Sequence, residues 1–271
     1  MTTKQHKQAR VPRWYHPLLA VQFLTRLPVT LSGQVAESDL AEAMSWYPLV
    51  GGALGAFTAA CATGLTAWLP AHISAALALA FLSIITGNLH LDGLMDTADG
   101  FYGGYTRERR LEIMRDSRVG AHGVAAGIVT LLLKWSLIWA LLQSQRLVWA
   151  LPLALSASRW SLVLMAKSQP SARKDGLGRT YAKHLRPRHL VWATLAWIAA
   201  VATALFLKGS LGPTGVPDRK WTLALVTAPA ISLLFGRYVT KKIGGLTGDT
   251  LGATSELVEL AVLLVVSIGA L

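Results

Sequence analysis

The chain repeatedly runs for about 20 residues through apolar side chains before it meets a cluster of charge, glycine or proline, and a helix of that length crosses a bilayer core. Of its 271 residues, 53% are hydrophobic and only 15% are charged. A soluble globular domain usually carries about a quarter of its residues as charged ones. We therefore predict an all-α fold, a polytopic integral membrane helical bundle that forms one membrane-embedded domain over residues 1–271.

The apolar runs predict seven transmembrane helices. Their expected bounds are Tyr47–Trp68, Ala71–Leu91, Val119–Leu142, Leu147–Lys167, Leu190–Leu207, Trp221–Val239 and Leu257–Leu271. An earlier run, Trp14–Val29, contains two prolines and Arg26, which favours an interfacial or re-entrant helix over a span. Residues 1–46 are thus predicted to be a cytoplasmic or interfacial N-terminal segment.

The net charge of +12 comes from 26 basic and 14 acidic residues. Basic residues collect in the N-terminus and in segments 107–118, 173–188 and 237–242. The positive-inside rule places such segments in the cytoplasm. We predict a multi-pass protein of the bacterial cytoplasmic (inner) membrane, with its N-terminus inside, its C-terminus outside and its active site facing the cytoplasm. No nucleic-acid partner is expected, because basic and aromatic residues are not interleaved on a soluble module.

Two pairs of glycines stand at helical spacing inside predicted spans, Gly51 with Gly55 and Gly123 with Gly127. Small residues at this spacing let lipid-embedded helices approach closely. We interpret both pairs as packing surfaces between helices.

Six of the 14 acidic residues fall within positions 92–116, at the expected cytoplasmic end of the second span and in the loop after it. Asp92, Asp96 and Asp99 are spaced i, i+4 and i+7, so a helix would place them on one face, where they repel one another unless cations neutralise them. Oxygen ligands of this kind suit Mg²⁺, which often shares its shell with phosphate oxygens. The alternative is a solvated helix end. We predict that these three aspartates bind Mg²⁺.

Other polar residues near the motif are candidates for catalysis. His90 can orient an aspartate, act as a base toward a hydroxyl or cap the helix, and its sequence position does not decide among these roles. Asp116 stands before Ser117 and Arg118 at the mouth of the next span and is a further catalytic candidate. Glu108 and Glu112 alternate with arginines at ion-pair spacings, which favours an exposed charged helix.

A phosphate-bearing substrate requires cations, and the arginine fork matches phosphate oxygens. Arg118 and Arg159 are the predicted phosphate-binding residues. Arg159 lies inside a span, where a cation needs a partner or a wet cavity, and Lys134 in another span is expected to pair with a carboxylate.

A second acidic group appears late in the chain, at Asp249, Glu256 and Glu259. These residues could face the aspartate motif from another helix and complete a metal or substrate site. The alternative is simple charge at a helix end.

Five segments resemble the cobalamin-5′-phosphate synthase family, the adenosylcobinamide-GDP ribazoletransferases, in family order across nearly the whole chain. The segment Arg109-Arg110-Leu111-Glu112-Ile113-Met114-Arg115-Asp116-Ser117-Arg118 is especially specific. The remaining segments are Phe23–Val29, Trp46–Gly51, His90–Gly104 and Gly248–Glu259, and the specific segment lies within Arg107–Gly123.

The resemblance implies a transferase in which α-ribazole or its 5′-phosphate attacks adenosylcobinamide-GDP and releases GMP, a late step of cobalamin biosynthesis with Mg²⁺ as cofactor. It adds Arg26 to the expected substrate-binding residues. Many relatives have glutamate where this chain has Leu91, so its metal shell would differ from theirs if that glutamate were a ligand. The lipid bilayer is the third expected partner, and self-association into a homo-oligomer is left open.

Two other functions compete with this reading. The acidic motif is reminiscent of CDP-alcohol phosphotransferases, although their Asp-Gly to Ala-Arg spacing is not matched here. An ion-coupled transporter would use intramembrane carboxylates and Arg159 as a relay. Transporter sites usually lie near the bilayer midplane, whereas these aspartates border a loop, which favours an enzyme.

Overall fold

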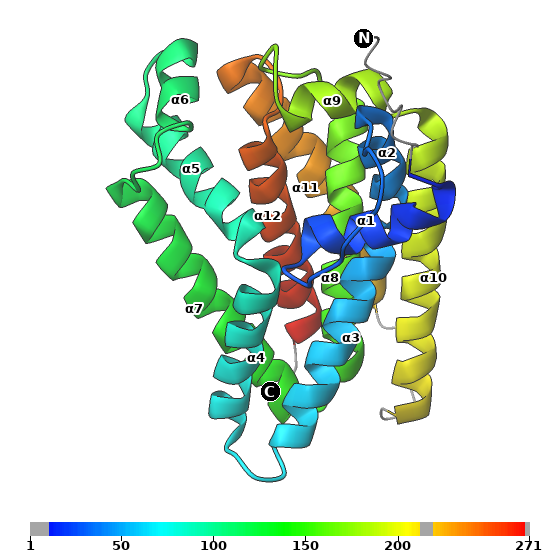
Figure 1. The fold of residues 1–271 in the computed structure, drawn as a ribbon. Helices are drawn as coiled ribbons and strands as arrows, with labels where there is room; N and C mark the ends of the chain where they lie inside the picture. The colour runs from blue at the N-terminus through cyan, green and yellow to red at the C-terminus, as the bar shows by residue number, and fades with distance from the viewer. Residues whose placement is uncertain (1–10, 212–218, 269–271) are drawn as a thin grey trace.

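The computed structural model describes residues 11–211 and 219–268, in which Ser171 and Leu246 form an isolated β-bridge. The described chain is otherwise helices and loops (Figure 1). The α-helices are α1 His16–Leu24, α2 Glu37–Ala43, α3 Tyr47–Leu65, α4 Ala71–Thr86, α5 Leu89–Gly103, α6 Arg107–Ile113, α7 Ala121–Gln143, α8 Leu147–Ser168, α9 Leu177–His184, α10 Pro187–Leu211, α11 Arg219–Ile243 and α12 Gly248–Ser267, and two short 3-10 helices cover Arg13–Tyr15 and Met44–Trp46.

Six described helices are long and apolar enough to cross a membrane, or seven elements if the bent pair of α4 and α5 counts as one span. The predicted all-α, multi-pass bundle is therefore confirmed. The second predicted span, Ala71–Leu91, differs from the structure because α4 ends at Thr86. The predicted last span, Leu257–Leu271, starts nine residues later than α12 does, and residues 269–271 lie outside the described part.

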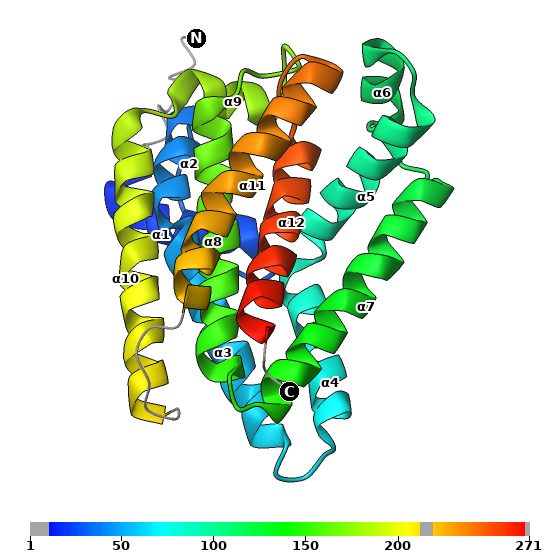
Figure 2. The same cartoon turned by 180° about the vertical axis from the view of Figure 1, so that it is seen from behind.

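Helix α8 is the centre of the bundle, with α3, α10, α11 and α12 packed around it (Figures 1 and 2). Gly51 and Gly55 allow α3 to lie directly on α8. A Cβ atom added at Gly51 would come within 2.5 Å of the Leu155 carbonyl oxygen, and one at Gly55 within 2.8 Å of the Leu151 oxygen. The predicted packing role of this glycine pair is confirmed.

A sharp bend separates α4 from α5. Gly87 and Asn88 both adopt the left-handed conformation, with φ of 59° and 56°, and the two helix axes meet at 86°. The Arg26 side chain lies against the Cα of Gly87, where a Cβ atom would collide with it, and the Arg26 N–H donates to the Ile85 carbonyl. The bend redirects the acidic motif on α5 away from the axis of the span.

The basic connections between helices lie at one end of the bundle, and two connections with little charge lie at the other. Helices α6 and α9 and the link from α11 to α12 lie at one end, whereas the α3–α4 and α7–α8 connections lie at the other (Figures 1 and 2). The basic segments 107–118, 173–188 and 237–242 thus share one end, as predicted. The basic start of the chain lies outside the described residues.

The interrupted N-terminal run forms α1, whose nine residues are too short to span a bilayer. In Figure 1 this helix lies across the bundle rather than along it. Pro17 occupies its first turn, where the missing N–H costs nothing. The predicted interfacial character of this segment fits such a crosswise helix.

Candidate active site

The acidic motif forms helix α5 as expected, but its three aspartates do not share one environment. Asp99 is buried, and its two carboxylate oxygens accept hydrogen bonds from the Gly120 N–H at 2.7 Å and the Gly123 N–H at 2.8 Å. These N–H groups begin α7 and have no partner within their own helix. Asp99 therefore holds α7 against α5, and its role as a metal ligand beside Asp92 and Asp96 stays a prediction.

Asp92 and Asp96 face another carboxylate, that of Asp249 at the start of α12. Asp92 and Asp249 are the two carboxylates that repel the charge on Asp96 most strongly. Helices α5 and α12 touch through glycines, because a Cβ atom at Gly93 would come within 2.7 Å of the Asp249 carbonyl oxygen. Two of the three predicted metal ligands thus gather with Asp249, which the sequence predicted as a substrate-binding residue.

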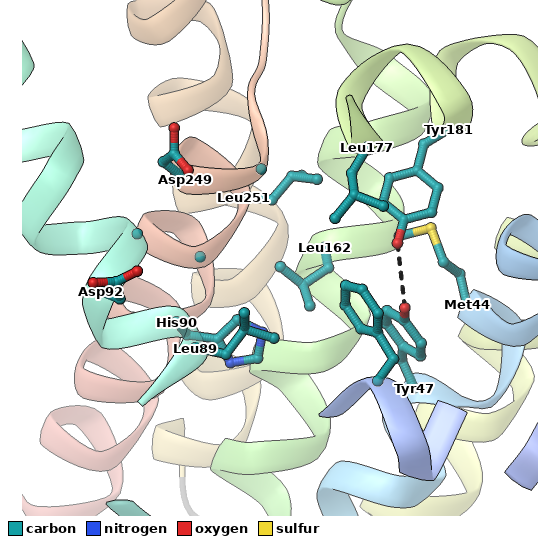
Figure 3. A pocket seen from close by; sticks show the side chains of 14 residues that line it. Met44, Tyr47, Leu89, His90, Asp92, Leu162, Leu177, Tyr181, Asp249 and Leu251 are labelled. Carbon is teal, nitrogen blue, oxygen red and sulfur yellow. Dashed lines mark hydrogen bonds between the residues drawn. The ribbon is translucent and has the colours of Figure 1, made fainter. Parts of the chain in front are cut away.

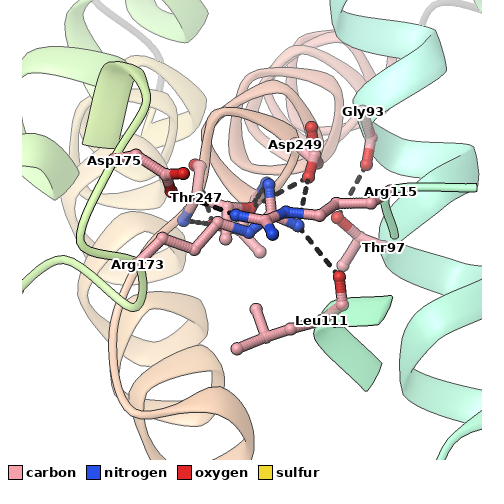
Figure 4. Close-up of polar contacts among 9 residues, drawn as sticks. Gly93, Thr97, Leu111, Arg115, Arg173, Asp175, Thr247 and Asp249 are labelled. Carbon is pink, nitrogen blue, oxygen red and sulfur yellow. Dashed lines mark hydrogen bonds and ion pairs between the residues drawn. The ribbon is translucent and has the colours of Figure 1, made fainter. Parts of the chain in front are cut away.

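Arg173 is the cation of this group, and it was not among the site residues predicted from the sequence. Its Nη2 lies 3.7 Å from the Asp249 carboxylate and also donates to the Leu111 carbonyl at 3.3 Å (Figure 4). Burial lowers the pKa of its guanidinium, while Asp249 acts in the opposite direction. The only sequence signal was its membership of a basic segment between two spans.

Pairing between two loops explains how Arg173 reaches α12. The Leu246 N–H donates to the Pro170 carbonyl at 2.8 Å, and the Ala172 N–H donates to the Leu246 carbonyl at 2.9 Å. Gly245 permits this approach, because its φ is 152° and a Cβ atom would collide with the Pro170 oxygen. The loop after α8 is thereby fixed beside the first turn of α12.

Arginines of α6 stabilise the same loops. The sequence predicted an exposed, charged helix here and did not predict these contacts. Arg107 donates to the Ile243 carbonyl at 2.8 Å and to the Ala172 carbonyl at 2.9 Å. Arg110 donates to the Lys242 carbonyl at 3.1 Å. The prediction does hold for the glutamate Glu112, which forms an exposed pair with its neighbour Arg109.

Arg173 and Asp249, which pair with each other, line two different cavities. One, of about 440 Å³, is lined by charged residues of α6 and of the loop after α8, including Arg115, Arg173 and Asp175. Arg115 and Asp175 pair across it at 3.0 Å (Figure 4). This charged cavity lies on the Arg173 side of the aspartate group.

The other cavity, of about 140 Å³, is lined by Asp92 and Asp249 at one end and by apolar and aromatic side chains at the other (Figure 3). His90 also lines it and is only 5% exposed. The backbone of His90 lies against α12, because a Cβ atom at Gly252 would come within 3.0 Å of its carbonyl oxygen. His90 is therefore held close to the aspartates, as a catalytic histidine or an orienting one would be.

Arg159 lines neither of these two cavities, and its role in binding phosphate stays a prediction. It is 3% exposed, donates to the Ser255 hydroxyl at 2.7 Å and lies 3.6 Å from Glu259. Lys134 pairs with Glu256 at 2.8 Å and with Glu259 at 2.7 Å. Glu256 and Glu259 therefore belong to a buried ion network rather than to the aspartate group, and the predicted pairing of Lys134 is confirmed.

The remaining predicted residues lie at the surface. Asp116 is exposed and accepts hydrogen bonds from Arg118, which hold the pKa of its carboxyl down at about 2. The Arg118 side chain is 88% exposed and neutralised by this pair. Arg26 is exposed and lies against the bend between α4 and α5. None of the three is brought to the aspartate group by a contact among the described residues.

The donor set of the aspartate group suits a hard divalent cation. Within residues 11–211 and 219–268, no three histidine, cysteine or acidic side chains are arranged as a ready-made metal site. Mg²⁺, however, commonly takes only one or two carboxylates and completes its shell with water and substrate phosphates. The mutual repulsion of Asp92, Asp96 and Asp249 is relieved by such a cation, so the residues present fit Mg²⁺.

Fold and site together define a class: a multi-pass helical membrane protein with a carboxylate and arginine site at the end of its bundle. The chain belongs to the cobalamin-5-phosphate synthase family, whose model matches residues 16–267.

Curated proteins that are similar to this chain align with it over nearly their whole length, and their names agree with this family. The chain is 40% identical over 255 residues to the adenosylcobinamide-GDP ribazoletransferase of Syntrophobacter fumaroxidans, covering 92% of this chain and 97% of that protein. The enzyme of the same name from Pseudomonas aeruginosa strain UCBPP-PA14 is 41% identical over 252 residues, covering 93% and 97%. That of Ralstonia pickettii is 34% identical over 258 residues, covering 92% and 94%. No solved structure gives a significant match.

Proposed function

We propose that this chain joins α-ribazole or its 5′-phosphate to adenosylcobinamide-GDP and releases GMP, as the names of its relatives indicate for them. The observation that carries the proposal is the group of Asp92, Asp96 and Asp249 beside Arg173, with one cavity lined by Asp92 and Asp249 and another by Arg173. A transfer between two large substrates requires two approaches to one reacting phosphate, and the two cavities supply them.

The reaction is a phosphoryl-type substitution. A ribose hydroxyl oxygen bonds to the phosphorus that carries the cobinamide, and the bridging P–O bond to GMP breaks with its electron pair. The hydroxyl proton passes to a base, for which His90 and the carboxylates beside it are the candidates, since all line the smaller cavity. Positioning and charge stabilisation supply most of the catalysis in reactions of this type.

Asp92, Asp96 and Asp249 would hold Mg²⁺, which when bound neutralises phosphate charge and improves GMP as a leaving group. Arg173 would bind phosphate oxygens from the other side, because its guanidinium already faces Asp249 and lines the charged cavity. Arg115 lines the same cavity and extends the cationic surface toward solvent. Asp249 thus takes the place in the proposed metal set that the sequence analysis gave to Asp99.

The buried charged residues are paired with one another, which argues against an ion-coupled transporter. Glu256 and Glu259 are both bound to Lys134, so neither is available as a free intramembrane carrier. The resemblance to CDP-alcohol phosphotransferases is limited to clustered aspartates near a membrane surface.

The metal-ligand proposal is tested with Asp96→Asn, which keeps the shape of the side chain and removes its charge. We expect GMP release from adenosylcobinamide-GDP and α-ribazole to fall by a factor on the order of 100 or more at any Mg²⁺ concentration. Glu37→Gln is the matched control, because Glu37 is an exposed carboxylate on α2 that pairs with Lys183 and His184.

A Mg²⁺ titration of GMP release, with equal amounts of protein in detergent and a thermal melt of each variant, separates the outcomes. A folded Asp96→Asn protein with the wild-type rate and Mg²⁺ midpoint would contradict the metal-ligand role. Wild-type protein that releases no GMP with Mg²⁺ and both substrates would contradict the proposed reaction itself.

We further propose that the basic end of the bundle faces the cytoplasm, in the inner membrane, since the substrates are large polar molecules and since positive loops remain inside. Impermeant thiol reagents test this in intact cells, on a Cys61→Ser background. Lys174→Cys at the basic end should be unreactive from outside, and Trp68→Cys, an 83% exposed position at the opposite end, should react. The reverse pattern would overturn the orientation.

A further inference from the structure

The smaller cavity has an aromatic end to which the proposed function assigns no group of either substrate. Opposite Asp92 and Asp249 it is closed by Tyr47 from α3 and Tyr181 from α9 (Figure 3). Phe23 from α1 also lines the cavity and lies against Tyr47. The Phe23 and Tyr47 rings stack nearly parallel, with centroids 5.7 Å apart and 11° between their planes. Together with Leu162 these rings form a flat, apolar recess.

The polar groups of the aromatic side chains at this end are the two tyrosine hydroxyls. The Tyr47 and Tyr181 hydroxyl oxygens lie 3.4 Å apart, and both side chains are buried, with exposures of 1% and 2%. Burial raises the pKa of Tyr181 to about 12, so its hydroxyl keeps its proton. Two hydroxyls carry two protons, and the pair uses one of them internally. One proton therefore remains for a ligand.

The number of hydrogen-bond donors in the recess distinguishes between the aromatic groups of the two substrates. The base of α-ribazole, dimethylbenzimidazole, is flat and apolar, and once joined to ribose it presents a single ring nitrogen as acceptor. Guanine presents several donors and acceptors along one edge. Each polar group left unpaired in a buried site costs about 1–3 kcal/mol, so guanine is rejected by a recess that offers one proton.

We infer that the aromatic end of this cavity binds the base of α-ribazole, with Phe23, Tyr47 and Tyr181 against the ring and the tyrosine pair donating to its nitrogen. The inference rests on the proposed function, because it assigns one of that reaction's substrates to this cavity. A base held there leaves its ribose pointing toward Asp92 and Asp249, where the hydroxyl must attack. Guanosine is then left to the charged cavity beyond Arg173.

The test compares the double variant Tyr47→Phe/Tyr181→Phe with wild type in steady-state GMP release. Because both donors are lost while ring shape is kept, we expect KM for α-ribazole to rise about tenfold and KM for adenosylcobinamide-GDP to change less than about twofold. Tyr238→Phe is the matched control, since Tyr238 lies on α11 outside the cavity, where its ring contacts Phe101. We expect both KM values of the control to match wild type.

A second measurement needs no variant. Free dimethylbenzimidazole should inhibit wild-type protein competitively toward α-ribazole and not toward adenosylcobinamide-GDP, and equilibrium dialysis should show its binding without either substrate. Binding by dialysis tests the cavity even if no GMP is released, which separates failure of this inference from failure of the proposed reaction. The inference is overturned if the double variant raises KM for adenosylcobinamide-GDP instead, or if dimethylbenzimidazole does not bind.

Discussion

Replacing Lys134 by methionine removes one cation from the buried ion network and keeps a side chain of similar length. Its ammonium lies within 2.8 Å of Glu256 and 2.7 Å of Glu259, and the three side chains are only 9%, 6% and 3% exposed. Without Lys134, both carboxylates face Arg159 alone. Breaking a buried ion pair by removing one partner costs about 3–5 kcal/mol. For a chain of this length, that loss corresponds to a melting temperature lower by on the order of 10 °C.

A compensating variant separates lost charge from lost packing. Lys134→Met/Glu256→Gln removes one charge of each sign and leaves Arg159 with Glu259, so we expect it to recover more than half of the lost stability. Lys183→Met serves as the surface control, because its pair with Glu37 is exposed and worth less than about 1 kcal/mol.

Thermal unfolding in one detergent, followed by circular dichroism, measures all three variants against wild type. The reasoning is refuted if Lys134→Met melts within about 2 °C of wild type, a shift worth no more than about 1 kcal/mol. It is also refuted if the double variant is no more stable than Lys134→Met.

Three further perturbations follow from contacts at the site. Gly93→Ala should lower GMP release at least about tenfold and lower the melting temperature, because its Cβ would collide with the Asp249 backbone. Asp99→Ala should destabilise the protein by about 2 kcal/mol in the same melt, since a half-buried and a buried N–H group lose their acceptor. The pair of Asp116 and Arg118 should add no pH dependence to the melting temperature between pH 5 and 8. The pKa of Asp116 is lowered to about 2, so its stabilisation is present above the unfolded pKa and lost only in strong acid, and Asp116→Asn melted across this pH range checks it.

Hydrophobic periodicity predicted most helices because span length and loop charge are local properties of the sequence. The break after Thr86 was missed, because Gly87 and Asn88 stand inside an apolar run and their left-handed conformation is stabilised by a contact with Arg26. Sequence spacing likewise placed Asp92, Asp96 and Asp99 on one helix correctly. It gave no information on which neighbouring helix each carboxylate meets.

The charged residues inside the spans were recognised as needing partners, but the partners are set by tertiary packing. The partners of Arg159 were not predicted, because nothing in the sequence pairs α8 with the glutamates of α12. Arg173 was missed for the same reason, since its position depends on backbone bonds between two loops that are over 70 residues apart. The site is therefore less predictable than the fold, because it is assembled from distant segments.

The buried ion network also imposes an order on membrane insertion. Lys134 and Arg159 lie on α7 and α8, which are synthesised before α12 brings Glu256 and Glu259. Until that last helix emerges from the ribosome, two cations must enter the bilayer without their counter-charges, at a cost of about 2.5–3.5 kcal/mol each at the centre of a helix. In a nascent chain stopped before α12, we expect α7 and α8 to be less stable in the lipid by this cost. We therefore expect the bundle to reach its full stability only when α12 has inserted and supplied the two glutamates.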